Sequence, residues 1–464
     1  MPENRADIAF IGAGPAGYVG AIRAAQLGAR VAIVERDALG GTCLNRGCIP
    51  SKALIACVET LARCKDAGAF GIDVQVTGVS VDRVRRHMER CVKQLVSGVE
   101  ALMKKNGITV FRGHGSLRSP TELEVQLAGA DRATVSAGKI VLATGSVPLR
   151  LPIPGGDLPG VVDSDSALAL ESVPESIAII GGGAIGLEWA FIYAGLGAKV
   201  TVLEMMPSIL PTEDEEITAE LTKSLRKRGI KIITRARCNA IEQQGDSYRL
   251  LYELDGQEGS VEAAQVMMAA GRRAVTESMG LEAVAVALER RCIKVNERFE
   301  TSVPGIYAVG DCIRGIGLAH LASHEAIAAA ENAFGHNGFV NAAAVPACVF
   351  TWPEVASVGL KERDARAQGL DVSVGRFPFR ANGKSIGAGE REGFVKLVVH
   401  APSGRLLGGV IFGPEASSLI AEVALAVHHE LTASDVAEAI HAHPTLPETI
   451  AEAALGALGR AIHI

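Results

Sequence analysis

Two cysteines lie close together near the N-terminus, in the stretch GGTCLNRGCIPSKAL, where four residues separate Cys43 from Cys48. Neighbouring cysteines serve as structural disulfides, as metal ligands or as redox-active dithiols. The spacing alone leaves all three open, because each kind of site uses close cysteines. The rest of the sequence has to decide among them, beginning with the elements that would position the two thiols.

Cysteine usage in the rest of the chain bears on this choice. The chain holds nine cysteines, an odd number, and most of the others, Cys312 among them, stand alone. This is typical of a reduced protein and not of a disulfide scaffold, so we expect a cytoplasmic location. The N-terminus carries Glu3 and Asp7 and runs directly into a strand pattern, which does not fit a signal peptide.

Length and composition indicate a multidomain globular protein. With 464 residues the chain is too long for one ordinary core, and about three domains are expected. Hydrophobic residues at 48% and charged residues at 21% exclude a disordered chain, and a net charge of -6 gives no support to nucleic-acid binding. The apolar run 177–198 is long enough to span a membrane, but Glu188 within it and its glycine spacing argue against a span.

A glycine-rich turn predicts the first nucleotide site. Gly12, Gly14 and Gly17 follow an apolar strand pattern at 7–11 and open a helical stretch. Glycines let the backbone turn tightly and approach a phosphate, and the helix N-terminus supplies free N–H groups. Glu35 ends the next strand pattern, where its carboxylate can accept a hydrogen bond from a ribose hydroxyl.

The same order of elements recurs at 176–204 and predicts a second nucleotide site. Gly181, Gly183 and Gly186 form the glycine turn, and Glu204 ends the second strand. A carboxylate there would repel a 2′-phosphate and bind a free 2′-hydroxyl, which favours NAD over NADP; alone, it would be an ordinary charge at a strand end. Two dinucleotides in one chain suggest hydride transfer between a flavin and a nicotinamide.

These motifs together carry a resemblance to a known family. The stretch around Cys43 and Cys48 resembles the flavin disulfide reductases, the class I pyridine nucleotide-disulfide oxidoreductases, and its form CLNRGCIPSK is most similar to the branch that oxidises dihydrolipoyl groups. The resemblance covers the whole chain, with GAGPAGY, ATGSVP, GGGAIGLE, AAGRR, YAVGDC, LAHLASHEA and HAHPTLPE in the family's order. A Cys43–Cys48 disulfide would close a small ring and stabilise little, so its use would be electronic.

The resemblance implies an α/β fold with two Rossmann-like dinucleotide-binding domains and a C-terminal α+β dimerisation domain. We expect an FAD-binding domain with the dithiol at 1–147 and an NAD-binding domain at 148–275. The segment 276–342 would complete the FAD domain, and 343–464 would form the dimer interface.

The resemblance also assigns roles around the dithiol. Cys48 would lie against the flavin and form a charge-transfer thiolate, and Cys43 would be the outer thiol that exchanges with the substrate. Lys52 would reach the flavin ring and pair with Glu188 beside the nicotinamide. Taken alone, Lys52 would be a surface lysine and Glu188 an unusual polar residue in a helix.

The expected acid–base pair lies far away in the sequence, in HAHPTLPETI. His443 can take a thiol proton near neutral pH, and Glu448 would orient its ring and stabilise the imidazolium form. His441 is expected to be a neighbour without a role in the reaction. The family's arrangement places this base at the disulfide of the other subunit, so a monomer would be inactive.

Further residues are implied for cofactor binding by their positions in the family's motifs. Asp311 would hold the ribityl hydroxyls of the flavin, and His320 would stand beside the ring. No metal site is expected. The other implied positions are Thr42, Gly115, Thr144, Gly145, Gly271 and Ala319.

The implied reaction is oxidation of a dihydrolipoyl-lysine on a carrier protein by NAD, through FAD and the disulfide. Glutathione-type reductases have basic residues after the second strand of the second nucleotide fold, where this chain has Glu204. Mercuric reductases carry a C-terminal cysteine pair, which this chain lacks, and a non-catalytic flavin-binding subunit would not need the dithiol and its base. Four departures from the family's pattern leave the lipoyl carrier open: Trp352, Ser417–Ser418, Ala274–Val275 and Lys384–Ser385.

Overall fold

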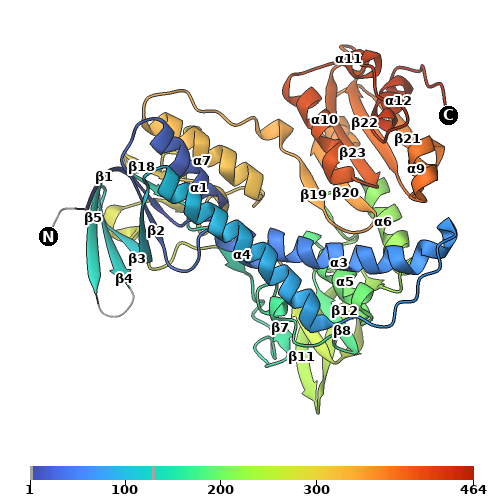
Figure 1. Ribbon diagram of the computed structural model, residues 1–464, viewed down its shortest axis with the longest axis horizontal. Coiled ribbons are helices and arrows are strands. Elements are labelled where there is room, and N and C mark those ends of the chain that lie inside the picture. Colours follow the sequence, from blue (N-terminus) through green and yellow to red (C-terminus); the bar gives the residue numbers. More distant parts are fainter. Residues whose placement is uncertain (1–3, 128–130) are drawn as a thin grey trace.

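The computed structural model describes residues 4–127 and 131–464, which form three packed regions around separate sheets. In Figure 1 the N-terminal region lies on the left, the second region below the centre and the C-terminal region at the upper right. Helix α3 (Cys48–Asp66) leaves the first region, packs against the second and passes beneath the third. The helix that begins with Cys48 therefore connects all three regions.

The first region is a dinucleotide-binding fold. Its parallel strands follow the order β3-β2-β1-β5-β18, and β4 adds an antiparallel ribbon between β3 and β5. Strand β2 is buried along its length because helices cover the parallel part of the sheet. Helices α1 and α7 pack side by side on one face (Figure 1). The elements are β1 (Asn4–Ile11), α1 (Pro15–Gln26), β2 (Val31–Glu35), β3 (Thr109–Ser119), β4 (Glu122–Leu127), β5 (Arg132–Leu142), β18 (Ile306–Ala308) and α7 (Ala319–Ala333).

Cys43 and Cys48 lie on a short helix and on the long helix that follows it, and a second long helix comes next. Helix α2 (Gly41–Arg46) contains Cys43, and α3 follows after Gly47. A 3-10 turn, η1 (Ala67–Phe70), and an extended segment then lead to α4 (Val81–Lys105). Helix α4 is long and amphipathic, with an exposed polar face and an apolar stripe that packs on α3.

The second region repeats the dinucleotide-binding fold. Its five-stranded parallel sheet has the order β10-β9-β8-β14-β7. Helix α5 lies between this sheet and α3. Because both neighbours cover it, nearly all of its residues are apolar. The elements are β7 (Val161–Val162), β8 (Ser176–Ile180), α5 (Ala184–Leu196), β9 (Lys199–Leu203), α6 (Glu215–Lys227), β10 (Lys231–Ile233), β11 (Ala236–Gln244), β12 (Ser247–Leu254), β13 (Gln257–Ala263) and β14 (Gln265–Met268), of which β11–β13 form an antiparallel sheet.

The apolar run 177–198 is divided between a strand and a helix. Residues up to Ile180 belong to β8, the glycine turn follows, and α5 has only 13 residues. In residues 4–127 and 131–464, no helix is both long and apolar enough to cross a bilayer.

The chain crosses between the first two regions at a small antiparallel ribbon. Strand β6 (Ser146–Pro148) leaves the first region, and β15 (Arg272–Ala274) returns from the second. Their pairing holds the two crossings side by side.

The third region is an antiparallel sheet of order β19-β20-β23-β22-β21, packed against helices α10 and α12. Strand β23 is buried at every position. Its elements are β19 (Ala347–Val349), β20 (Glu354–Gly359), α8 (Glu362–Ala367), β21 (Val372–Pro378), α9 (Gly383–Ala388), β22 (Phe394–His400), β23 (Leu406–Gly413), α10 (Ala416–His428), α11 (Ala433–Glu438) and α12 (Glu448–Ala457). Short connecting elements elsewhere are η2 (Ser166–Ala169), η3 (Glu282–Val284), β16 (Leu288–Glu289), β17 (Cys292–Ile293), η4 (Gly310–Cys312), η5 (Ala342–Ala344) and η6 (Phe379–Ala381).

Candidate active site

The first glycine turn has the shape that a dinucleotide phosphate needs. Gly12 has φ +100°, and a Cβ there would collide with the carbonyl oxygen of Ala143. A Cβ at Gly17 would collide with the carbonyl of Gly12, so this glycine lets α1 approach the strand. Gly14 is the N-cap of α1, and a Cβ built there would meet only the Cα of Gly41, at 3.8 Å. The helix N-terminus is therefore open to the cavity. A pyrophosphate fits this bare backbone.

The two acids that end the second strands have matching environments. Glu35 Oε2 accepts from the Ala13 N–H at 2.7 Å, and its Oε1 accepts from the Asp37 N–H at 2.9 Å. Glu204 accepts from Gly182 at 2.6 Å and from Met206 at 2.7 Å in the same pattern. Each buried carboxylate thus locks its glycine turn to the strand end, and each oxygen keeps a lone pair for a ribose hydroxyl.

The two cysteines face each other across the junction of α2 and α3. Both are half-buried thiols that line one cavity. The pKa of the Cys48 thiol is lowered, chiefly because the Cys43 thiol donates a hydrogen bond to it and Lys52 adds a positive charge, which together outweigh burial. The pKa of the Cys43 thiol is raised by that same hydrogen bond, by burial and by the charge on Cys48. Cys48 is therefore the thiol that ionises first.

Lys52 connects the dithiol helix to the second region. Its Nζ lies 3.0 and 2.9 Å from the two carboxylate oxygens of Glu188, a buried residue of α5. The Phe350 N–H donates to Glu188 Oε1 at 3.1 Å, and Lys52 Nζ stands 4.3 Å from the centre of the Phe350 ring. One charged pair thus joins α3, α5 and the start of the third region, beside Cys48.

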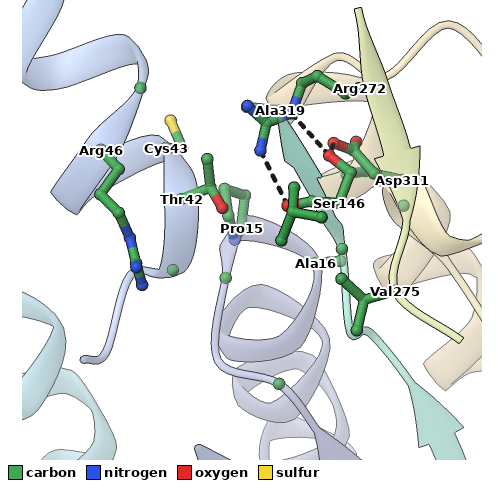
Figure 2. Close-up of a pocket in the computed structure, with 18 of the residues that line it drawn as sticks. Pro15, Ala16, Thr42, Cys43, Arg46, Ser146, Arg272, Val275, Asp311 and Ala319 are labelled. Atoms are coloured by element: carbon green, nitrogen blue, oxygen red, sulfur yellow. Dashed lines mark hydrogen bonds between the residues drawn. The ribbon is translucent and has the colours of Figure 1, made fainter. Parts of the chain in front are cut away.

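A hydrogen-bonded chain leads from the interdomain ribbon to Asp311. Arg272 Nε donates to Ser146 Oγ at 2.8 Å, and Ser146 Oγ donates to Asp311 Oδ2 at 2.5 Å. Figure 2 shows Ser146 between the guanidinium of Arg272 and the carboxylate of Asp311, facing Thr42 and Cys43 across the cavity. The Thr144 hydroxyl donates to the carbonyl of Val275 at 2.6 Å, which ties the two crossings together beside this chain.

A single cavity collects residues from both dinucleotide folds. The dithiol, Lys52 and Glu188 lie in its wall together with the open turn of the first fold. The N-terminal part of α5 closes the side toward the second fold. The predicted site residues that line it are Gly12, Gly14, Glu35, Thr42, Cys43, Cys48, Lys52, Gly115, Thr144, Gly145, Glu188, Asp311 and Ala319.

The other predicted nucleotide residues lie outside this cavity, and all of them except Gly17 belong to the second glycine turn and its surroundings. Gly181 has φ +114°, and a Cβ there would collide with the carbonyl of Ala269, while Gly183 has open space above it. The second turn therefore repeats the geometry of the first. These residues are Gly17, Gly181, Gly183, Gly186, Glu204 and Gly271, of which Gly17 serves packing in the first fold.

The predicted acid–base pair is formed, but far from the dithiol of its own chain. His443 Nδ1 and Glu448 Oε1 are 2.9 Å apart, and the Thr445 N–H donates to Glu448 Oε2 at 2.7 Å. Burial acts to raise the pKa of Glu448, but the hydrogen bonds from Thr445 and His443 outweigh it and lower the pKa. The His443 side chain is 80% exposed, and neither residue is among the described residues that line the cavity.

The neighbouring histidine, His441, has a different set of hydrogen-bond partners. His441 Nε2 lies 2.8 Å from Glu422 and its Nδ1 lies 2.8 Å from the carbonyl of Ala439, so both ring nitrogens are engaged within the chain. Glu448 binds only Nδ1 of His443, so Nε2 of that ring points away from the pair. Of the two histidines, His443 has the geometry of a base.

Sequence reasoning missed several residues of the cavity wall. Cys348 lies in it as a third thiol, and burial raises its pKa to about 11. Arg46, Asp165 and the pair Ser146–Arg272 also line it. Only Ser146 and Arg272 lay in motifs that could have drawn attention, ATGSVP and AAGRR.

The departures from the family pattern fall in different places. Val275 lies in the cavity wall, and its N–H donates to Gly145 at 2.9 Å. Trp352 packs with its ring 5.1 Å from the guanidinium of Arg228 and 5.9 Å from that of Arg63. The departures at 384–385 and 417–418 lie on α9 and α10, away from the cavity.

Paired dinucleotide folds with a dithiol and a charged pair between them define a two-nucleotide oxidoreductase. The chain belongs to the pyridine nucleotide-disulphide oxidoreductases: residues 6–326 match that family, and residues 345–454 match its dimerisation domain. The expected cofactors, FAD and NAD, are those of this family, and the expected fold class is confirmed.

Individual relatives agree along the whole chain. A dihydrolipoyl dehydrogenase of Bacillus subtilis is 41% identical, covering 98% of this chain and 99% of that protein. One from Thermus scotoductus is 42% identical, covering 99% and 98%. Among solved structures, LpdA from Mycobacterium tuberculosis matches with a TM-score of 0.91 at 28% identity, covering 97% of this chain and 99% of that one. The HOCl-induced flavoprotein disulfide reductase RclA from Escherichia coli matches with a TM-score of 0.85 at 27% identity, covering 96% and 98%.

Proposed function

We propose that the protein oxidises dihydrolipoyl-lysine on a carrier protein to lipoyl-lysine, with NAD as the final electron acceptor. The observation that carries this proposal is the shared cavity, in which Cys43 and Cys48 lie between the open glycine turn of the first fold and Glu188 of the second. Residues of both dinucleotide folds thus line the cavity that holds the dithiol. The names of the full-length relatives support the same reaction.

The first chemical step would use the base of a second copy. His443 of that copy takes a proton from one substrate thiol, and Glu448 orients the ring and stabilises its charge. The substrate thiolate attacks Sγ of Cys43 in the Cys43–Cys48 disulfide, forming a mixed disulfide and releasing Cys48 as a thiolate. The lowered pKa of Cys48 suits it to this leaving role.

The second step completes the oxidation of the substrate. The protonated His443 gives its proton to Cys43 and takes the proton of the other substrate thiol. The sulfur of that thiol attacks the substrate sulfur of the mixed disulfide, which releases lipoyl-lysine and leaves Cys43 as the thiol. The charge of Lys52 acts to lower the pKa of Cys48 and so favours its thiolate. A bound FAD would supply an acceptor for two electrons from the dithiol and a hydride donor for NAD. The chain would hold FAD at Gly12, Gly14, Glu35 and Asp311, and NAD at the second turn.

Glu204 supports NAD as the nucleotide. Its buried carboxylate already binds two backbone N–H groups, so it cannot swing away to admit a 2′-phosphate. A phosphate placed there would meet a fixed negative charge.

The proposed partners are a lipoylated carrier and a second copy of the chain. The dimerisation domain supports the homodimer. His443 is exposed and remote from the cavity of its own chain, so a shared site accounts for its position. The isolated cysteines support a cytoplasmic location.

The test measures NADH formation from dihydrolipoamide with NAD or NADP, using wild type, Cys43→Ser and Cys57→Ser. Cys57 is a half-buried cysteine of α3 outside the cavity and serves as the matched control. We expect activity with NAD only, lost in Cys43→Ser and retained in Cys57→Ser. Equal rates with NADP would contradict the role of Glu204, and an active Cys43→Ser variant would contradict the dithiol mechanism.

A further inference from the structure

Four consecutive acidic residues of the second region face the third region. They lie at 213–216, where the loop after β9 ends and α6 begins. In Figure 1 α6 lies beneath the third region, and it contacts β23 there. Each acid pairs with a cation of the dimerisation domain: Glu213 with Lys361 at 3.5 Å, Asp214 with Lys396 at 3.1 Å, Glu215 with Arg363 at 3.4 Å and Glu216 with Arg376 at 3.3 Å. We call this set of ion pairs the interdomain clamp.

Lys396 is the buried centre of the clamp. Its side chain is only 3% exposed, and its Nζ also lies 2.7 Å from Glu216 Oε1 and 2.9 Å from Glu362 Oε2. Burial acts to lower the pKa of Lys396, but its carboxylate partners outweigh burial and raise that pKa above its ordinary value. A buried charge needs its partners in fixed places, because a displaced partner would leave it unpaired. Lys396 therefore restrains Asp214, the most buried of its three acids.

Asp214 ends the loop that follows Glu204. Its Oδ2 accepts from Lys396, and its Oδ1 caps α6 by accepting from the Glu216 N–H at 3.0 Å. The start of the loop is held by Glu204, whose Oε1 accepts from the N–H of the second loop residue at 2.7 Å. We call residues 205–213 the nucleotide loop. Both of its ends are thus held by buried carboxylates.

Between these ends the nucleotide loop contacts the second glycine turn. The Leu210 N–H donates to the carbonyl of Gly182 at 3.0 Å, and the Glu213 N–H donates to the carbonyl of Leu210 at 2.8 Å. A Cβ built on Gly182 would lie 3.0 Å from the Ile209 side chain. Leu210 has φ +44°, a left-handed conformation that leucine adopts only where surrounding contacts hold it. The glycine turn is therefore supported by a loop whose own conformation depends on its anchors.

We propose that Lys396 is a positioning residue for the second nucleotide: through Asp214 it holds the nucleotide loop against the glycine turn and so sets the affinity for NAD. The inference rests on the proposed function, in which NAD binds at that turn. The contacts run without a gap from the dimerisation domain through the loop to Gly182. Lys396 is not among the described residues that line the dithiol cavity. Its loss should therefore weaken NAD binding and leave the thiol chemistry unchanged.

The test uses carboxylate-to-amide changes in two adjacent acids as a matched pair. Asp214→Asn removes the charge that faces Lys396 but keeps the helix cap, because asparagine caps a helix as well as aspartate does. Glu215→Gln removes an acid that is 78% exposed, whose ion pair is screened by water. Lys396→Met removes the other member of the buried pair. Circular dichroism and flavin content establish that each FAD-loaded variant is folded at the assay temperature.

Two measurements separate the loop from the nucleotide. Hydrogen exchange without nucleotide, followed by mass spectrometry, should be faster at 205–213 in Lys396→Met and Asp214→Asn and unchanged in β9. Because a site formed only part of the time binds its ligand correspondingly more weakly, the calorimetric Kd for NAD should rise about tenfold in Lys396→Met and about threefold in Asp214→Asn. It should stay within about 1.5-fold of wild type in Glu215→Gln. The kcat and the KM for dihydrolipoamide should stay near those of wild type.

Unchanged exchange at 205–213, or an unchanged Kd for NAD in Lys396→Met, would overturn the proposal. An equal rise of the Kd in Glu215→Gln would also overturn it, since the effect would then be one of overall charge. A rise in the KM for dihydrolipoamide as large as that in the Kd for NAD would do the same, because Lys396 would then act on the dithiol site. A wild type that binds no NAD would refute the function proposed above, while hydrogen exchange would still decide whether Lys396 orders the loop.

Discussion

The Lys52–Glu188 pair gives the sharpest prediction about the dithiol, because its two members act on Cys48 in opposite directions. The charge of Lys52 lowers the pKa of the Cys48 thiol, and the charge of Glu188 raises it. Lys52→Met should therefore raise the pKa of Cys48, and Glu188→Gln should lower it further. A thiolate is lost as the pH falls through its pKa, so Lys52→Met should lose the Cys48 thiolate at a higher pH than wild type does.

The stability cost follows from the geometry of the pair. Removing one member of a fully buried ion pair costs about 3–5 kcal/mol. The Glu188 side chain is only 9% exposed but Lys52 is 31% exposed, so water screens the pair in part and we expect a loss of about 2 kcal/mol. Glu188→Gln should lose less than Lys52→Met, because its amide oxygen can still accept from Phe350.

The assay is a pH titration of the reduced, FAD-loaded protein. A thiolate beside the flavin gives a long-wavelength absorbance band, whose midpoint reports the apparent pKa of Cys48. Urea unfolding of the same samples reports the stability loss. The reasoning is refuted if both variants move the midpoint in the same direction, or if Lys52→Met leaves it unmoved while the flavin stays bound.

Three further predictions concern other parts of the molecule. Ser146→Ala removes the hydroxyl between Arg272 and Asp311 and should weaken FAD binding about tenfold, whereas Ser146→Thr should bind FAD like wild type. Fluorescence titration of the apoprotein measures this, and equal binding by Ser146→Ala would show that these hydrogen bonds do not position Asp311. The Lys396 side chain is only 3% exposed, and Lys396→Met would leave Asp214, Glu216 and Glu362 without their shared lysine. Urea unfolding should show a loss of about 3 kcal/mol in the free energy of unfolding, and a loss below about 1 kcal/mol would mean that water solvates this cluster. Burial raises the pKa of Cys348 to about 11, so in a Cys43→Ser/Cys48→Ser variant its rate of alkylation should be slow at neutral pH and rise about tenfold per pH unit up to that value. Peptide mass spectrometry measures the alkylation, and fast, pH-independent labelling would contradict this environment.

The two nucleotide folds could be predicted from the residues because their signals are local, whereas the expected chemistry of the dithiol came from the family resemblance. A glycine turn between a strand and a helix is specified by a few adjacent residues, as at Gly12–Gly17 and Gly181–Gly186. The His443–Glu448 pair is also local, since the carboxylate stands at the first position of α12, five residues after the ring.

Contacts between regions could not be predicted from residue spacing, because they depend on how separately folded sheets pack. Ser146 and Arg272 are 126 positions apart and meet only where β6 and β15 pair, and Cys348 joins the cavity only because β19 lies across α5. Residues 72–76 have the alternation of a strand, yet the backbone groups of residues 73–79 have no partner within the described residues. Sequence by itself therefore determined the local turns and the reactive side chains. The tertiary structure decided which of these side chains share a cavity, because burial and charge act through space and not along the chain.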